Sequence, residues 1–191
     1  PDIMQINGIG GANFVTSKVA IVSPSSRDDA DINYLFAQVQ IEDAFVDFNP
    51  PCGNILSGIG PFAIQSGLVK AQDGKTTVRI FHENISALIE AVVETPGGQV
   101  NYEGDTAIDG VPGTGAPIIL NWQNIVGAKT GKMLPTGNFI DVIDGVSVTC
   151  VDVAMPMVLM KAEDLGVSGN ETAEELQANE ALFAKMEPIR L

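Results

Sequence analysis

Short segments in which apolar and polar positions alternate recur along the chain, and this pattern predicts a protein rich in β-strands. Four of them carry many β-branched or aromatic residues and are flanked by turn-forming or charged residues, as strands typically are. They lie at residues 16–24, 32–41, 76–83 and 87–95. A Pro-Gly-Gly turn at 96–98 precedes a further alternating stretch at 99–108, which predicts the returning strand of a hairpin.

The second part of the chain adds strands and a helical tail. Residues 109–122 predict a loop followed by a strand, and residues 146–165 form the most apolar strand-like run of the sequence. From Asn170 onward the pattern predicts an acidic amphipathic helix, with Thr172 and Glu175 as a capping box at its start. Pro188 is expected to break that helix.

One segment has the helical rather than the strand period. In residues 52–69, apolar side chains at positions 55, 56, 59, 62, 63 and 64 fit a helix that is buried nearly all round. Pro61 removes one backbone hydrogen bond and is expected to kink or split the helix. The many short strands around a few helices predict an α+β fold.

The bulk composition narrows the possible functions. With 191 residues, 45% of them hydrophobic, the chain can bury a core as one large domain or two small ones. A net charge of -14, from 24 acidic and 10 basic residues, repels phosphate backbones and anionic lipid surfaces. No apolar run approaches the roughly 20 residues that span a bilayer. We therefore expect no nucleic acid and no membrane as partners, whereas a small anionic molecule can still bind where backbone N–H groups converge.

Two cysteines, Cys52 and Cys150, and a single histidine, His82, are too few for a zinc site, so no metal is expected. The apolar content and the absence of a signal peptide favour a reducing, cytoplasmic location with both thiols free. The chain begins at Pro1 in turn-like sequence and stops at Leu191 within a helical pattern. Both ends suggest a piece cut from a longer chain.

Cys52 has an unusual sequence environment. Pro50 and Pro51 favour an extended backbone up to the thiol, and Gly53 and Asn54 supply turn residues at which a helix can begin. At a helix N-terminus, unpaired N–H groups stabilise a thiolate and can also hold a carboxylate. Such a thiol transfers protons or attacks electrophiles, but a buried cysteine acting as a small hydrophobic residue fits the same pattern.

A glycine-rich segment at residues 8–18 ends in Lys18. Its glycines allow a ligand to approach the backbone closely, and its polar side chains offer neutral donors. It lacks the spacing of a dinucleotide-binding loop. Lys18 is either a desolvated base or a surface lysine at a strand end. The candidate substrate-binding residues here and beside Cys52 are Gly10, Gly11, Ala12, Asn13, Thr16, Ser17, Gly53 and Asn54.

Several segments, in their order and spacing, resemble one known family. They are GIGGANFVTSKVAIVS, YLFAQVQI, CGNILSGIGPFAIQSGLV, VPGTGAPI, LPTGN and VDVAMPMV. The resemblance is to the family of the PrpF protein, whose members include 2-methylaconitate cis-trans isomerase, methylitaconate delta-isomerase and 4-oxalomesaconate tautomerase. It covers nearly the whole chain and is most specific around Lys18 and Cys52.

The resemblance implies a diaminopimelate epimerase-like fold. That fold has two pseudo-equivalent lobes, each a β-barrel-like sheet wrapped around a central helix, with the active site between them. Residues 1–128 would be most of the first lobe, with Lys18 and the Cys52 helix, and residues 129–191 the start of a second lobe that is largely missing. Family chains are about twice as long, so part of the cleft would be absent.

The resemblance also implies a function. Lys18 and Cys52 correspond to the family's acid/base pair, and the implied enzyme is a cofactor-independent isomerase of a small unsaturated di- or tricarboxylate such as 2-methylaconitate. For that substrate it would act in propionate catabolism, in the methylcitrate cycle. The expected partners are this substrate and further copies of the chain.

Two other functions remain open. One is a cysteine-pair epimerase or racemase that uses Cys150 opposite Cys52, and the other is a catalytically incompetent fragment or carboxylate-binding lobe. His82 lies on a predicted strand without an acid/base partner in the pattern, which favours a structural role.

Overall fold

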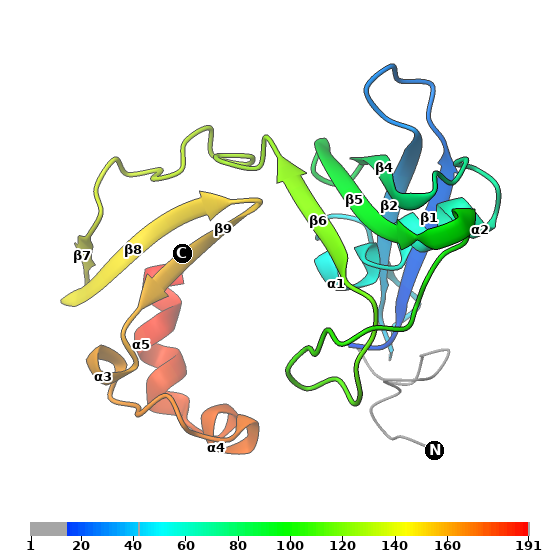
Figure 1. Ribbon diagram of the computed structural model, residues 1–191. Helices are drawn as coiled ribbons and strands as arrows, with labels where there is room; N and C mark the ends of the chain where they lie inside the picture. The colour runs from blue at the N-terminus through cyan, green and yellow to red at the C-terminus, as the bar shows by residue number, and fades with distance from the viewer. Residues whose placement is uncertain (1–14, 42, 191) are drawn as a thin grey trace. The chain divides into compact units, whose positions relative to one another are not determined.

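The computed structural model describes residues 15–41 and 43–190 (Figure 1). The chain divides into two compact units, residues 1–124 (unit 1) and 125–191 (unit 2). The described strands form one mixed six-stranded sheet and one three-stranded sheet, so the predicted α+β class is confirmed, but these strands close into no barrel. The assignment of the two units to two lobes of a larger protein stays a prediction.

Unit 1 is built on the six-stranded sheet, with strand order β1-β2-β4-β5-β6 and β3 also paired to β2. The strands are β1 Lys18–Pro24, β2 Ile32–Val39, β3 Val46–Asp47, β4 Gly74–His82, β5 Ala87–Thr95 and β6 Ile118–Gln123. Strands β2 and β4 are parallel, and the other neighbours are antiparallel. The crossover that two parallel strands require is made by the segment that holds Cys52 and two short helices.

The strand predictions for this unit are largely confirmed. The four alternating runs form β1, β2, β4 and β5, and the loop-then-strand pattern of residues 109–122 ends in β6. The predicted return strand at 99–108 is wrong. A short 3-10 turn at Pro96–Gly98 places Gly97 and Gly98 at positive φ, and the edge of β5 that does not pair with β4 pairs with β6 instead.

The predicted helix at 52–69 is two helices, α1 Gly53–Leu56 and α2 Ile59–Gln65. The break falls at Ser57 and Gly58, not at Pro61. Pro61 is the third residue of α2, where a backbone N–H has no intrahelical partner to lose. The helices are buried on one side only, since Phe62 is exposed.

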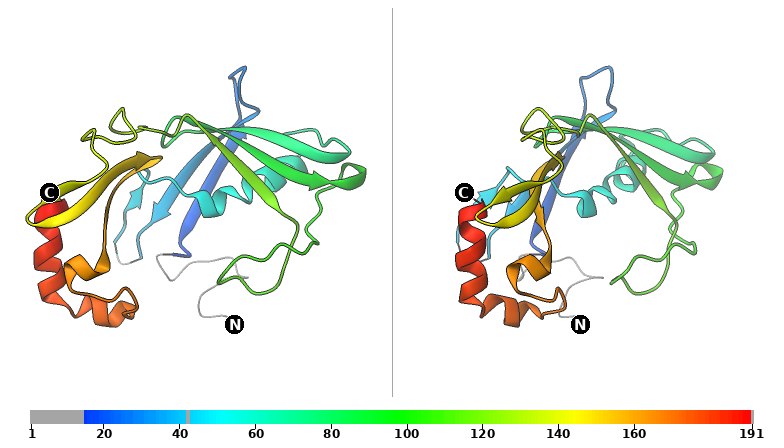
Figure 2. Two further views of the ribbon diagram at one scale, coloured as in Figure 1. Left: turned by 60° about the vertical axis from the view of Figure 1, so that its left-hand side comes forward. Right: turned by 90° about the vertical axis from the view of Figure 1, so that its left-hand side faces the viewer.

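Close packing of α2 on β5 fixes the core of unit 1, and Figure 2 shows both helices on one face of the sheet. A Cβ atom placed on Gly60 would lie 2.9 Å from Val93 and 3.0 Å from Ala91, so only glycine allows this approach. In β5 every second residue is buried, as expected of a strand with one covered face.

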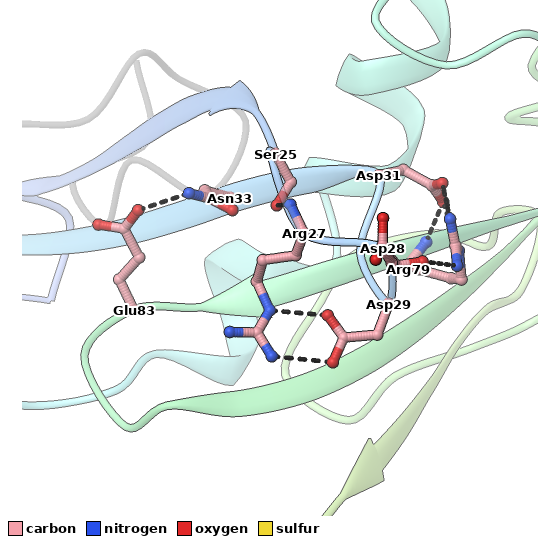
Figure 3. Close-up of polar contacts among 8 residues, drawn as sticks. All are labelled: Ser25, Arg27, Asp28, Asp29, Asp31, Asn33, Arg79 and Glu83. Carbon is pink, nitrogen blue, oxygen red and sulfur yellow. Dashed lines mark hydrogen bonds and ion pairs between the residues drawn. The ribbon is translucent and has the colours of Figure 1, made fainter.

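The turn between β1 and β2 is tied to β4 by Arg79 (Figure 3). Its guanidinium donates to the carboxylate of Asp31 and to the backbone carbonyl of Asp28, while the Arg79 backbone N–H donates to Asp31 as well. Burial acts to raise the pKa of Asp31, but the hydrogen bonds from Arg79 hold it below its usual value. These contacts lock the parallel pairing of β2 and β4 at that end of the sheet.

Unit 2 holds the three-stranded antiparallel sheet β7-β8-β9 and three helices. Its elements are β7 Asp141–Ile143, β8 Val146–Val153, β9 Met155–Met160, α3 Ala162–Leu165, α4 Ala173–Gln177 and α5 Glu180–Arg190. The core cluster consists of Val146, Val148 and Ile189.

The predictions for unit 2 are partly confirmed. The apolar run at 146–165 is a hairpin followed by a helix, because Ala154 turns the chain at a φ of 64°. The capping box of Thr172 and Glu175 is present. The tail breaks at residues 178–179, and Pro188 lies inside α5. No helix in the described ranges is long and apolar enough to span a bilayer.

Candidate active site

The two predicted catalytic side chains meet in unit 1. The Nζ atom of Lys18 lies 3.5 Å from the Sγ atom of Cys52, within hydrogen-bond distance for a sulfur acceptor. The residues are 34 positions apart in the sequence, and they come from the start of β1 and the start of α1. The geometry therefore places an amine and a thiol where a proton can pass between them.

Strand alternation directs Lys18 toward the helices. Its register partner on β2 is Gln38, whose side-chain amide donates to the carbonyl of Ser17 and fixes the backbone just before Lys18. The Lys18 ammonium lies 5.9 Å from the ring centre of Phe36, a residue of the buried sheet face. A cation over an aromatic face is attracted by the ring quadrupole, which helps hold the amine at the sheet surface.

Cys52 is the N-cap residue of α1, in an extended conformation with φ -139° and ψ 105°. This confirms the expected position at a helix start. The side chain is 7% exposed, so the thiol is buried but reachable from Lys18. Helix α1 has a single turn before the break at Ser57, so its dipole is smaller than that of the continuous helix that the sequence predicts.

A buried tyrosine, which sequence reasoning missed, holds the backbone of Cys52. The hydroxyl of Tyr34 donates to the Cys52 carbonyl at 3.3 Å. Tyr34 is fully buried, and burial raises the pKa of its phenol well above the usual value, with the charge of Cys52 adding to the effect. The signal was available in the sequence, since alternation puts Tyr34 on the helix-facing side of β2, where a hydroxyl needs a partner.

Asn84 fixes the segment that leads to Cys52. Its side-chain amide donates to the carbonyls of Phe36 and Phe48, and its oxygen accepts from the backbone N–H of Phe36. One side chain thus joins β2 to the residues just before Pro50 and Pro51. The thiol is positioned by this connection and by Tyr34 rather than by a hydrogen bond of its own helix.

His82 lies behind the pair, fully buried between two aromatic rings. Its ring centre is 4.6 Å from that of Tyr34 and 6.2 Å from that of Trp122. Both ring nitrogens lack a hydrogen-bond partner. Burial lowers the pKa of His82 to about 4, so the imidazole is neutral near pH 7.

The predicted substrate-binding residues are described only in part. Gly10, Gly11, Ala12 and Asn13 lie outside the described residues. Thr16 and Ser17 precede β1, and Ser17 is buried, with its carbonyl accepting from Val39 and Gln38. Gly53 and Asn54 open α1 directly after Cys52, and the Asn54 carbonyl accepts from Ser57. Whether any of these residues contacts a substrate stays a prediction.

The described residues include few other side chains that are suited to catalysis or to metal binding. Cys52 and Cys150 are both free thiols, and they belong to different units. No cluster of metal-ligating side chains occurs within the described ranges. The Lys18 and Cys52 contact is therefore the strongest candidate site for acid/base chemistry in the part of the chain that the structure describes.

An α+β unit that presents a lysine and a thiol in contact at a helix start has the features of a protein that transfers protons. Comparison with known proteins identifies the family. Residues 1–191 match the model of the PrpF protein family, and the chain belongs to that family.

Individual relatives agree with this assignment. A 4-oxalomesaconate tautomerase of Pseudomonas putida is 54% identical over 191 residues, which cover 100% of this chain and 53% of the relative. A 3-methylitaconate isomerase of Eubacterium barkeri is 46% identical over 194 aligned residues, covering 100% of this chain and 51% of the relative. The crystal structure of a methylitaconate-delta-isomerase superposes with a TM-score of 0.78 at 46% identity, covering 100% of this chain and 50% of that one. The chain spans about half the length of the curated relatives it matches.

Proposed function

We propose that this chain carries the proton-transfer pair of a cofactor-independent isomerase. The enzyme would move a double bond, or interconvert cis and trans forms, in a small unsaturated di- or tricarboxylate. The 3.5 Å contact between Lys18 Nζ and Cys52 Sγ is the observation that carries the proposal. Membership in the PrpF family and the isomerase or tautomerase names of the relatives support it.

The reaction needs one proton removed and one returned. In its unprotonated form, one member of the pair takes the acidic proton from the carbon next to the double bond. The electrons of that C–H bond move into the conjugated system, and negative charge develops on a substrate carboxylate. A protonated group then delivers a proton to the far carbon, and the double bond has moved. Because Lys18 and Cys52 touch, a proton passed between them restores the starting state.

The substrate carboxylates need partners near this pair. The predicted binding residues Thr16, Ser17, Gly53 and Asn54 are the chain neighbours of Lys18 and Cys52, and their backbone N–H groups can donate to a carboxylate. Hydrogen bonds to the charge that develops during proton removal would lower the barrier most. Three substrates fit the reaction: 2-methylaconitate, methylitaconate and 4-oxalomesaconate.

Proton exchange followed by NMR tests the proposal. The chain is incubated in D₂O with each of the three carboxylates, and deuterium is expected to enter the allylic position. Lys18→Ala and Cys52→Ser should abolish the exchange, whereas Cys150→Ser should leave it unchanged. Exchange that survives in Lys18→Ala and disappears in Cys150→Ser would replace the proposed pair by a cysteine pair.

A second candidate function follows from the length of the chain. Because the matched part is about half of each relative, it can hold a carboxylate without turning it over. Binding of a candidate carboxylate, seen as shifts in the chain's NMR spectrum, together with absence of deuterium uptake, would favour this binding function. The same assay on the Pseudomonas putida relative provides the positive control.

A further inference from the structure

The contact between Lys18 and Cys52 brings an amine close to an oxidisable sulfur. The Nζ atom of Lys18 lies 3.5 Å from the Sγ atom of Cys52. The thiol retains a small exposed fraction and Lys18 is half-buried, so the pair is open to a molecule about the size of water, such as hydrogen peroxide. Cysteines that a peroxide oxidises react as thiolates, and they typically lie beside a cationic side chain, as Cys52 does.

Oxidation of Cys52 would create an electrophile beside this amine. A peroxide converts a thiol to a sulfenic acid, whose sulfur is then captured by a second thiol or by a nitrogen. The sequence has one other cysteine, Cys150, and it belongs to unit 2. Unit 1 therefore supplies no second thiol, and the amine of Lys18 lies where a resolving cysteine is found in other oxidisable sites.

We propose that Lys18 and Cys52 form a reversible sulfenamide crosslink when the chain is exposed to hydrogen peroxide. In the first step, the Cys52 thiol and one peroxide molecule give the sulfenic acid and one water. In the second step, the unprotonated Lys18 amine attacks the sulfenic sulfur. The N–S bond forms and the S–O bond breaks, and the hydroxyl group leaves with an amine proton as a second water. The sulfur is oxidised by two electrons, and the peroxide is reduced by two.

The local structure favours Lys18 over the nearest alternative nucleophile. The four-carbon stem of a lysine is flexible, so the amine can close the gap to the sulfur. The backbone of Cys52 is held by the hydroxyl of Tyr34, which donates to its carbonyl. The backbone nitrogen of Gly53, the next residue, is the competing nucleophile. Its lone pair is delocalised into the peptide bond, so it is much less reactive than an amine.

The crosslink would connect oxidation to activity. It occupies both members of the proposed proton-transfer pair, so the oxidised chain would be inactive; this consequence rests on the proposed function. Two molecules of a thiol such as glutathione would restore the amine and the Cys52 thiol and leave as a disulfide. The crosslink would also protect Cys52 from oxidation to a sulfinic acid, which thiols do not reverse.

The crosslink itself depends on the contact and not on turnover. A chain that crosslinks but takes up no deuterium from D₂O would contradict the isomerase proposal alone. A chain that takes up deuterium but does not crosslink would contradict the crosslink alone.

Mass spectrometry of the 191-residue chain carrying Cys150→Ser tests the proposal. After treatment with hydrogen peroxide, the intact mass should fall by the mass of two hydrogen atoms, and a dithiol should restore it. After tryptic digestion without a reductant, segment 1–27 should be uncut at Lys18 and should stay joined to segment 28–70. The chain unfolded in urea should not join these segments, because the contact is then lost.

A matched pair of lysine variants sharpens the test. Lys18→Arg keeps a cation beside the thiol but removes the nucleophile, because a guanidinium stays protonated. In this variant the two segments should come apart, and the sulfenic acid should be trapped by a diketone such as dimedone. The thiol that a dithiol recovers after prolonged oxidation should fall several-fold. Lys75→Arg, at an exposed lysine of β4, is the control and should crosslink as fully as the parent.

Three results would overturn the proposal. In the first, peroxide leaves Cys52 of the folded chain as a thiol. In the second, Cys52 gains two oxygen atoms as a sulfinic acid while Lys18 stays free. In the third, the mass falls by two hydrogen atoms but the two segments come apart, so that the sulfur has bonded to the backbone nitrogen of Gly53.

Discussion

In unit 1 every second residue of β5 is buried, whereas in unit 2 five of the six residues of β9 are exposed. The difference originates in the sequences of the two strands. ALIEAVVET, the sequence of β5, carries polar residues on part of its outer face. Only its inner face must therefore be covered, and α2 covers that face by packing closely at Gly60. MPMVLM is apolar throughout and needs a cover on both sides. Unit 1 therefore buries most of the apolar face of its strand β5, whereas unit 2 leaves most of β9 exposed.

The burial of individual side chains follows the same division. Of the buried hydrophobic residues in the described ranges, those of unit 2 are Val146, Val148, Leu182 and Ile189, and all others belong to unit 1. The candidate catalytic pair lies in the better-packed unit. This placement fits the need to hold two reacting groups at a fixed distance.

The largest effect should come from truncating a buried side chain of β5, compared with the truncation of an exposed side chain of β9. Ile89→Ala removes a fully buried side chain from β5 and should cost about 2 to 5 kcal/mol of the free energy of unfolding. Leu159→Ala on β9 should cost less than about 0.5 kcal/mol, because the side chain is already exposed. Urea unfolding measures both, and equal losses would contradict the difference between the units.

His82 is expected to make unit 1 sensitive to acid. The folded pKa of about 4 is below the ordinary value of 6.5, so as the pH falls the unfolded state takes up the proton first. The full stability is present above about pH 6.5, and about 2 to 3 kcal/mol should be lost as the pH falls toward 4. His82→Phe should remove this dependence without destabilising the protein near pH 7, because both ring nitrogens lack partners. An unchanged pH profile in the variant would assign the acid sensitivity to other groups.

Tyr34 connects the core of unit 1 to the candidate site. Tyr34→Phe keeps the ring but leaves the Cys52 carbonyl without its donor, and should cost about 1 to 2 kcal/mol of stability. If the isomerase proposal is correct, kcat should fall more than KM changes, since the thiol would be less well placed. Tyr102→Phe, which removes a more exposed hydroxyl bonded to Gln65, is the matched control and should change neither quantity.

A smaller effect than that of Tyr34→Phe is expected at the capping box of α4. Thr172→Ala removes the hydroxyl that accepts from the Glu175 backbone and should cost about 1 kcal/mol. Thr172→Ser should recover most of this loss, because the hydroxyl is restored. Amide exchange in residues 173–177 measures both variants, and no change with alanine would mean that the helix is held by other contacts.

Sequence periodicity predicted the sheet of unit 1 well. The runs at 76–83 and 87–95 match β4 and β5 closely, because alternation along a half-buried strand is a local signal. The break between α1 and α2 was misplaced, because Pro61 is harmless so near a helix start. The strand expected at 99–108 is wrong because a strand also needs a neighbour to pair with. The edge of β5 on which it would lie is paired with β6.

The candidate site could not be identified from the hydrophobic periodicity of the sequence alone. Pattern alone left Lys18 and Cys52 with both functional and ordinary interpretations, and only the family resemblance joined them. Their contact depends on β1 and α1 meeting across 34 residues of sequence, which no local signal encodes. Alternation marked Tyr34 as a buried hydroxyl in need of a partner, but neither its partner nor that of Asn84 could be identified, since both partners are distant in the chain.

The contact between Lys18 and Cys52 can be probed through the reactivity of Cys52 toward two alkylating reagents, measured in a Cys150→Ser background. Iodoacetate carries a carboxylate and iodoacetamide is neutral, so the ratio of their rates reports a cation beside the thiol. With Lys18 Nζ 3.5 Å from Cys52 Sγ, we expect the ratio of the iodoacetate rate to the iodoacetamide rate to fall several-fold in Lys18→Met. A ratio that stays the same in Lys18→Met would contradict the contact on which the proposed proton transfer rests.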